Sequence, residues 1–275
     1  MVKTDYSELK EKARRIRINA LKAVYNAKSG HPGGSLSSAD ILTVLYFDEM
    51  NIDPGDPKKK GRDRFVLSKG HAAPALYATL AERGFYDEKE IMGLRKIGNR
   101  FQGHPNMHKV PGIEMSTGSL GQGFSAAVGM ATALKIDKID SRVYVLVGDG
   151  ELQEGIVWEA AMSAAHRKLD NLVVIIDLNG LQIDGRTEDV MNVSPVNDKF
   201  KAFGFNVIEV NGHSFEELID AFNNARNEKG RPTAIIAKTC KGKGVSFMEN
   251  QAGWHGKAPD NEQMKKAMEE LGGEF

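Results

Sequence analysis

An aspartate stands between two glycines directly after an apolar run, because Gly148-Asp149-Gly150 follows Val143–Val147. Glycines let a backbone approach a phosphate closely, and a helix that starts just after them offers N–H donors to an anion. A carboxylate at the same place repels a phosphate unless a divalent cation lies between them, and Mg²⁺ and Ca²⁺ prefer oxygen ligands. Asp149 is therefore a candidate ligand of a metal ion that bridges to a diphosphate.

A second oxygen ligand follows the next apolar run, Leu172–Leu178, where Asn179 opens a turn. Neighbouring parallel strands bring their carboxyl ends to the same edge of a sheet, so we expect Asn179 close to Asp149. Each motif alone is equally typical of a plain turn. Their occurrence on successive buried strands favours a metal–diphosphate site.

Most histidines of this chain stand next to a glycine in the sequence. Five of the seven adjoin a glycine, namely His31, His71, His104, His213 and His255. An imidazole on a tight glycine loop can approach a ligand, and it titrates near neutrality, which suits proton transfer and binding of sugar hydroxyls. The set favours a functional interpretation, although any one of them is more often structural. We interpret His213, His108 and His166 as structural.

The elements that must position these residues alternate along the chain. Apolar runs predict strands over 64–67, 143–147, 172–178, 206–210 and 233–237. Helical periodicity predicts helices over 9–24, 37–47, 71–83, 125–135, 215–226 and 261–271, and one from the Gly148 turn to about Arg167. The Ser37-Ser38-Ala39-Asp40 segment is expected to cap the 37–47 helix at its start. Gly84 is expected to end the 71–83 helix. This alternation predicts an α/β fold, a doubly wound and mostly parallel sheet with helices on both faces, in a single domain over 1–275.

Composition excludes several classes of protein. The 37 basic and 37 acidic side chains cancel, which argues against binding nucleic acid or a membrane surface. A single cysteine, Cys240, excludes an internal disulfide and a multi-cysteine metal cluster, and we interpret it as a bystander. The charged first 24 residues are unlike a signal peptide, and the last residues, from the 261–271 helix to Phe275, are typical of a natural chain end. We expect a cytoplasmic protein.

The Asp149 and Asn179 motifs together resemble those of thiamine-diphosphate enzymes, and the segments around them resemble the transketolase family. The similar segments, in the family's order, are SGHPGGS at 29–35, SKGH at 68–71, GHPN at 103–106, TGSLGQG at 117–123, GDGELQEG at 148–155 and IDG at 183–185. They cover essentially the whole chain. One departure is Ser119, where many relatives have proline.

The resemblance implies a role for each matching residue. The metal, Mg²⁺ or Ca²⁺, is expected on Asp149, Asn179 and the carbonyl of Leu181. Thiamine diphosphate is expected to contact His71, Gly118, Ser119, Leu120, Gly121, Gly148, Gly150, Glu151 and Glu154. His31, His104 and His255 are expected to be catalytic and to bind substrate, and Arg95 to meet a substrate phosphate. Glu154 and Glu159 resemble acids at a dimer interface, and both are equally typical of solvated first-turn carboxylates.

Transketolases of one chain are more than twice this length and carry a second domain that binds the aminopyrimidine ring. The resemblance therefore implies the N-terminal subunit of a split transketolase of the pentose phosphate pathway, active only with a C-terminal subunit, in two copies of each. The expected reaction moves a two-carbon ketol unit from a ketose phosphate to an aldose phosphate.

Three alternatives remain open at the level of sequence. The first is a subunit of an enzyme like deoxyxylulose-phosphate synthase, which shares the metal motif but uses pyruvate. The second is a non-catalytic regulatory subunit that binds the cofactor. The third is a nicotinamide dehydrogenase, which Asp149 and the non-glycine Gln153 at the sixth position of the glycine motif oppose.

Overall fold

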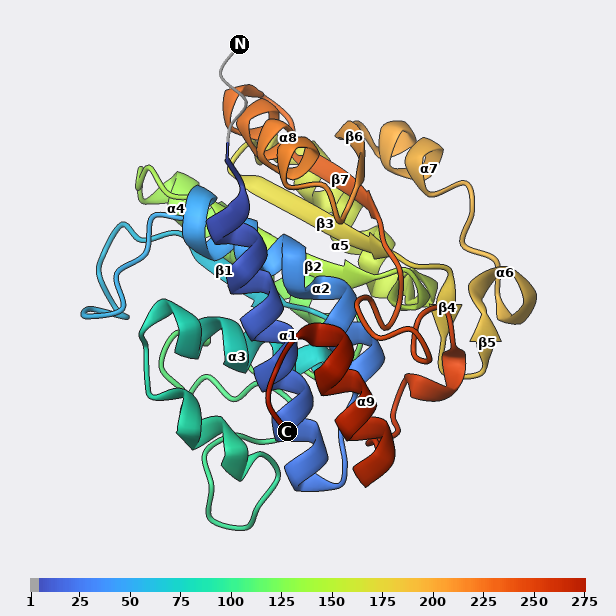
Figure 1. Ribbon diagram of the computed structural model, residues 1–275. Coiled ribbons are helices and arrows are strands. Elements are labelled where there is room, and N and C mark those ends of the chain that lie inside the picture. The colour runs from blue at the N-terminus through green and yellow to red at the C-terminus, as the bar shows by residue number, and fades with distance from the viewer. Residues whose placement is uncertain (1–4) are drawn as a thin grey trace.

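A computed structural model describes residues 5–275, so the first four residues of the predicted 1–275 domain lie outside the described residues. The chain forms a five-stranded sheet and a separate two-stranded hairpin (Figure 1). All neighbours in the large sheet are parallel. Its order is β1 (Arg64–Leu67), β2 (Val143–Gly148), β3 (Leu172–Leu178), β7 (Thr233–Lys238) and β6 (Asn206–Asn211). The five predicted strands are confirmed.

β2 lies inside the sheet and is apolar on both faces, which is why its apolar run is uninterrupted. Along β2, Val143, Val145 and Val147 enter one core, whereas Tyr144 and Leu146 enter the other. Successive residues of a strand point to opposite faces, so a strand covered on both sides must be apolar throughout. The predicted doubly wound fold is therefore confirmed.

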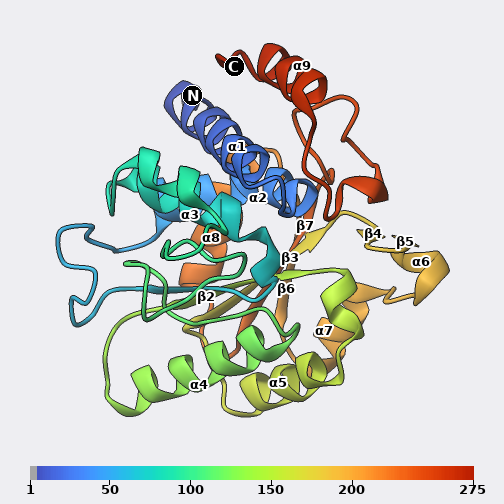
Figure 2. The ribbon, with the colours of Figure 1, turned by 90° about the horizontal axis from the view of Figure 1, so that it is seen from below.

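Helices cover the two faces in separate groups (Figure 2). The elements α1 (Ser7–Ala27), α2 (Pro32–Val44), α3 (Ala73–Arg83) and α8 (Phe215–Asn227) pack on one face. The elements α4 (Gln122–Ile136), α5 (Gly155–His166) and α7 (Val196–Phe203) pack on the other. A further helix, α9 (Asn261–Leu271), packs on α1 beside Trp254. No helix within residues 5–275 combines the length and the apolar character needed to cross a bilayer.

The predicted start of the second helix at Ser37 is wrong. The helix begins at Pro32, and Ser37 lies one and a half turns inside it, where its hydroxyl donates to Asp177 on β3 (2.7 Å). Pro32 fits the first helical position because its φ is preset and its missing N–H would have no partner there. Ser38 donates to the carbonyl of Gly34 within the helix (2.6 Å), so neither serine caps the helix.

Several short elements near the carboxyl edge of the sheet were not predicted. They are the hairpin of β4 (Leu181–Gln182) and β5 (Gly185–Arg186), then α6 (Thr187–Val190) and α7. The segment after Asp149 forms a 3₁₀ turn (Gly150–Gln153) before α5, rather than one continuous helix. The other predicted helices are confirmed, including the stop at Gly84, whose φ is 97°.

Two glycines of α4 differ in what surrounds them, and this gives a first prediction. A Cβ on Gly123 would lie 2.6 Å from the Cα of Ser68, whereas a Cβ on Gly129 would meet no atom within 4 Å. Gly123→Ala should therefore destabilise the chain by about 1–3 kcal/mol, because backbone must move. Gly129→Ala should stabilise it by about 0.5–1 kcal/mol through helix propensity. Urea unfolding of both variants measures the difference, and equal effects would contradict the close contact of α4 with Ser68.

Candidate functional site

The site begins where β2 and β3 end side by side. Gly148 pairs with Asp177 in the register of the two strands, which puts Asp149 beside the turn that follows β3. Asp149 is buried, and its carboxylate accepts the N–H groups of Gly150 (2.8 Å) and Gly180. Burial, together with the nearby carboxylate of Asp177, raises the pKa of Asp149 to about 6. A cation at this place would favour the charged form.

The turn after β3 presents two more oxygens to the same place. Gly180 adopts a φ of 77°, which lets the chain turn sharply between Asn179 and Leu181. The amide oxygen of Asn179 accepts the N–H of Leu181 (3.1 Å), and the carbonyl of Leu181 accepts the ammonium of Lys241 (3.2 Å). The structure therefore brings Asp149, Asn179 and Leu181 to one cavity.

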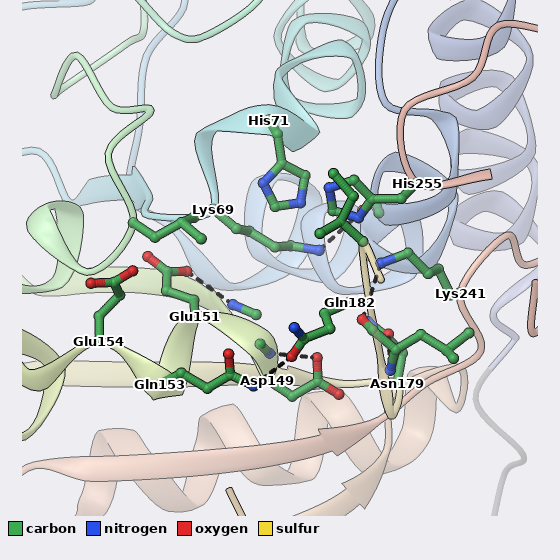
Figure 3. A pocket seen from close by; sticks show the side chains of 16 residues that line it. Lys69, His71, Asp149, Glu151, Gln153, Glu154, Asn179, Gln182, Lys241 and His255 are labelled. Atoms are coloured by element: carbon green, nitrogen blue, oxygen red, sulfur yellow. Dashed lines mark hydrogen bonds between the residues drawn. The ribbon is translucent and has the colours of Figure 1, made fainter. Parts of the chain in front are cut away.

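This cavity has a volume of about 290 Å³ and lies at the carboxyl edge of the sheet (Figure 3). Of the predicted cofactor contacts, its wall includes His71, Leu120, Gly148, Gly150, Glu151 and Glu154. Gly118, Ser119 and Gly121 belong to the same loop as Leu120 but are not part of the wall. In parallel α/β sheets ligands bind at this edge, so the position agrees with a small-molecule site.

Two lysines reach the cavity from different loops, and Figure 3 shows their ammonium groups near one another. Lys69 follows β1, donates to the carbonyl of Gly34 (3.0 Å) and forms an ion pair with Asp177. Lys241 follows β7 and is buried, and burial followed by the repulsion of Lys69 lowers its pKa to about 8. Asp177 is fully buried, and the charge of Lys69 overcomes the effect of burial and lowers its pKa to about 2.

The donor set fits a hard divalent cation. One carboxylate, one amide oxygen and one backbone carbonyl are ligand types of Mg²⁺ and Ca²⁺, which take phosphate or water oxygens in addition. Within residues 5–275 no group of three or more His, Cys, Asp or Glu side chains could hold a metal by itself. A cation bound here would therefore share its coordination with a ligand such as a diphosphate, which the two lysines would also attract.

Four of the glycine-flanked histidines meet above the cavity. The ring centre of His31 lies 5.4 Å from His71, 5.4 Å from His255 and 6.1 Å from His104. The Nδ1 atoms of His31 and His255 are buried without a hydrogen-bond partner among the described residues. Buried polar atoms are nearly always paired, so these two are suited to a ligand.

The pKa values of all four imidazoles are lowered, which favours their neutral forms. Burial, with the charge of Arg95 next, lowers the pKa of His31 to about 4. Burial, with the charge of Lys241 next, lowers the pKa of His255 to about 3. The pKa values of His71 and His104 are also lowered, mainly by burial. A neutral imidazole has one donor and one acceptor, so this cluster can bind several hydroxyl groups.

The remaining predicted residues lie around this centre. Arg95 is exposed and has a φ of 60°, and its guanidinium lies against Gly103, next to His104. Glu154 and Glu159 are exposed, and Glu159 lines a groove between α4 and α5. His213 contacts Asp40 (2.7 Å) and accepts the N–H of Cys240 (2.8 Å), away from the cavity wall, as its structural interpretation requires.

Sequence reasoning did not find Lys69, Lys241 or Asp177. Lys69 lies two residues after β1 and Lys241 three residues after β7, and Asp177 is the last but one residue of β3. The rule that ligands meet the carboxyl ends of parallel strands would have found both lysines. Asp177 gave no such signal, because its role depends on the burial of Lys69 beside it.

The chain is similar to known proteins in both sequence and structure. The family model for the thiamine diphosphate binding domain of transketolase matches residues 9–275. The chain is 48% identical to one of the subunits of apulose-4-phosphate transketolase from Phocaeicola vulgatus, over 96% of this chain and 93% of that protein. It is 44% identical to a 6-deoxy-6-sulfo-D-fructose transketolase subunit of a Clostridium species, over 96% of each.

Longer relatives match only in part. The chain is 46% identical to human transketolase, over 96% of this chain but 42% of that protein. A crystal structure of transketolase from Campylobacter jejuni superposes with a TM-score of 0.93 at 38% identity, over 98% of this chain and 44% of the other. The chain thus spans less than half the length of these two proteins.

The buried pair of Lys69 and Asp177 gives a second prediction. Asp177→Asn leaves an ammonium buried without its counter-charge, so the free energy of unfolding should fall by about 3–5 kcal/mol. Because the pKa of Asp177 is lowered in the folded protein, its contribution is present above the ordinary value of 3.8 and is lost as the pH falls toward about 2. Denaturant unfolding at several pH values should show the gap to the wild type narrowing at acid pH.

A matched control is Asp198→Asn, which removes one partner of an exposed pair with Lys201 (3.9 Å). Exposed pairs contribute about 0–1 kcal/mol, so this variant should unfold like the wild type. A gap for Asp177→Asn that stays constant between pH 5 and pH 2.5 would contradict the assigned charge of Asp177.

Proposed function

Because the chain belongs to the transketolase family, through its thiamine diphosphate binding domain, we propose that it is the subunit of a two-chain transketolase that holds the diphosphate and the metal. The observation that supports this most is the meeting of Asp149, Asn179 and the carbonyl of Leu181 with two lysines in one cavity beneath four neutral histidines. Metal–diphosphate ligands and hydroxyl-binding groups are the two halves of a ketol-transfer site.

The chain's own residues divide the work in this proposal. Asp149, Asn179 and Leu181 hold Mg²⁺ or Ca²⁺, and Lys69 and Lys241 neutralise the diphosphate with it. Thiamine diphosphate supplies the carbanion chemistry that moves a two-carbon unit. His31, His104 and His255 bind the hydroxyl groups of the sugar and pass their protons, as neutral donors and acceptors. Arg95, beside His104, meets a substrate phosphate.

A partner chain is part of the proposal. Three relatives of nearly the same length are named as subunits of transketolases, whereas the one-chain relatives are more than twice as long. We propose a C-terminal subunit that carries the pyrimidine-binding domain, with two copies of each chain. The exposed Glu154 and Glu159 would then lie at or near the contacts between subunits.

The substrates are sugar phosphates or related acidic sugars in this proposal. The relatives are named for apulose 4-phosphate and 6-deoxy-6-sulfo-D-fructose, so membership of the pentose phosphate pathway does not follow from the family. The pyruvate alternative has no relative named for it among these proteins. The several neutral histidines also suit a substrate with many hydroxyl groups better than pyruvate.

The deciding experiment is a ketol-transfer assay with thiamine diphosphate and Mg²⁺. It compares the chain alone, its C-terminal partner alone and the mixture, with pentose phosphates, apulose 4-phosphate and pyruvate as donors. Ketol transfer by the mixture only would establish the proposal. Activity of the chain alone would overturn the need for a partner, and activity with pyruvate only would favour the synthase reaction.

Removal of the metal ligand Asp149 gives a third prediction. Asp149→Asn should raise the Mg²⁺ concentration needed for half-maximal activity of the mixture by at least roughly 100-fold, because second-shell changes alone cost 10- to 100-fold. Asp198→Asn on α7 is the control and should leave that concentration unchanged. An unchanged requirement for Mg²⁺ in Asp149→Asn would contradict the metal assignment.

The histidine cluster gives a fourth prediction. His104→Gln should raise KM for the sugar substrate by about 10-fold, the effect of one lost neutral hydrogen bond, with thiamine diphosphate affinity unchanged. His108→Gln, four residues further along the same loop and exposed, is the control and should leave KM as it is. Steady-state kinetics of the mixture decide, and an unchanged KM in His104→Gln would remove it from the substrate site.

A further inference from the structure

Glu151 is an almost fully buried carboxylate at the edge of the cofactor cavity, with 2% of its surface exposed. It lies two residues after Asp149, on the 3₁₀ turn that links β2 to α5. Among the described residues it forms no ion pair, and both its oxygens accept hydrogen bonds from neutral donors. A charge buried in this manner is costly unless several donors satisfy it, so its partners indicate what it does.

The three partners come from three different loops. Oε1 accepts the hydroxyl of Ser68 (2.5 Å), just after β1, and the N–H of Gly121 (2.8 Å), just before α4. Oε2 accepts the N–H of Gly148 (3.0 Å), at the end of β2. We call these segments the Ser68, Gly118–Gly121 and Gly148 loops, the last of which begins at the end of β2. They contribute Lys69, Leu120 and Gly148 to the wall of the cavity. Figure 3 shows Glu151 among the side chains that line this cavity.

The loops meet so closely that glycine is required at the contacts. A Cβ on Gly70 would lie 2.7 Å from the hydroxyl of Thr117, and Gly121 adopts a φ of 79°. Ser68 extends the arrangement, because its hydroxyl also accepts the N–H of Phe124 (3.1 Å) in the first turn of α4. Where glycines bring loops into contact, the loops pack through their backbones. The backbone N–H groups that are buried in this way need hydrogen-bond acceptors.

We propose that Glu151 is a positioning residue that fixes the Ser68, Gly118–Gly121 and Gly148 loops relative to one another and so shapes the cofactor cavity. This replaces a direct cofactor contact as its role, and its link to thiamine diphosphate rests on the proposed function. The carboxylate is required because all three partners donate. A glutamine would turn its NH₂ group toward either Gly148 or the Ser68–Gly121 pair, where a donor would face a donor.

The test compares Glu151→Gln with Asp63→Asn. Asp63 is a matched control, because it is also buried and its carboxylate also accepts two backbone N–H groups, those of Asn51 (2.9 Å) and Arg142 (2.7 Å), away from the cavity. In Glu151→Gln without ligand, the exchange rate of the backbone amides at residues 121–124 or 148–150 should rise about 10-fold or more, the effect of one lost hydrogen bond. In Asp63→Asn the exchange rate should rise near Asn51 and Arg142 instead.

The second measurement is cofactor affinity in the mixture with the C-terminal subunit. Glu151→Gln should raise the dissociation constant of thiamine diphosphate with Mg²⁺ by about 10-fold or more, while kcat at saturating cofactor stays within about twofold. Glu151→Asp, which keeps the charge, should recover part of the affinity. Asp63→Asn should bind the cofactor like the wild type.

Ser68→Ala serves if Glu151→Gln does not fold, because it removes one partner and keeps the carboxylate. Exchange should then rise at Phe124 while Gly148 stays protected. Unchanged exchange at all three loops in Glu151→Gln, or equal loss of cofactor affinity in Glu151→Gln and Asp63→Asn, would overturn the proposal. A wild-type mixture that binds no thiamine diphosphate would overturn the proposed function instead, and the exchange pattern would still decide whether Glu151 holds the loops.

Discussion

The charges buried at the carboxyl edge of the sheet constrain the rest of this structure. Lys69, Lys241, Asp149 and Asp177 lie together with almost no exposure to water. An isolated charge in such a place would cost several kcal/mol, so the four must be close enough to compensate one another. That closeness requires β1, β2, β3 and β7 to end at the same level, which the in-register parallel pairing of the four strands provides. The buried charges of the cavity therefore depend on the parallel topology of the sheet, which brings them together.

The two carboxylates experience this arrangement differently. Asp177 has an ammonium and two hydroxyl groups around it, and its pKa is lowered to about 2. Asp149 accepts only backbone N–H groups, and burial raises its pKa to about 6. A carboxylate in direct contact with an ammonium is a structural counter-ion, whereas one without such a contact is suited to receive a metal. This difference, rather than sequence position, separates the proposed metal ligand Asp149 from its neighbour Asp177.

The sequence was sufficient for the five strands, because apolar runs of β-branched residues have few other structures available. It also predicted that Asp149 and Asn179 lie close together, since both follow such runs directly, and both line one cavity. It failed at Ser37, where the local signal for a cap competes with a buried partner 140 residues away. Lys69 and Lys241 stand shortly after strands, which marks them as candidates for the site, but the sequence does not show that both are buried. What could not be predicted depends on contacts between distant segments.

The role proposed for Glu151 likewise depends on contacts between distant segments, which the sequence does not show. In the sequence, the family resemblance implies that Glu151 contacts the cofactor directly. In the structure its neighbours are N–H and O–H donors from loops that are 83, 30 and 3 residues away. A cavity that binds an anion must point N–H groups inward, and the same loops then carry further N–H groups that point away from the ligand. A buried carboxylate behind the cavity satisfies these, while the lysines in front supply the positive charge that a diphosphate requires. The buried carboxylate, which accepts hydrogen bonds from the loops, and the lysines of the cavity wall are thus complementary parts of the proposed cofactor site.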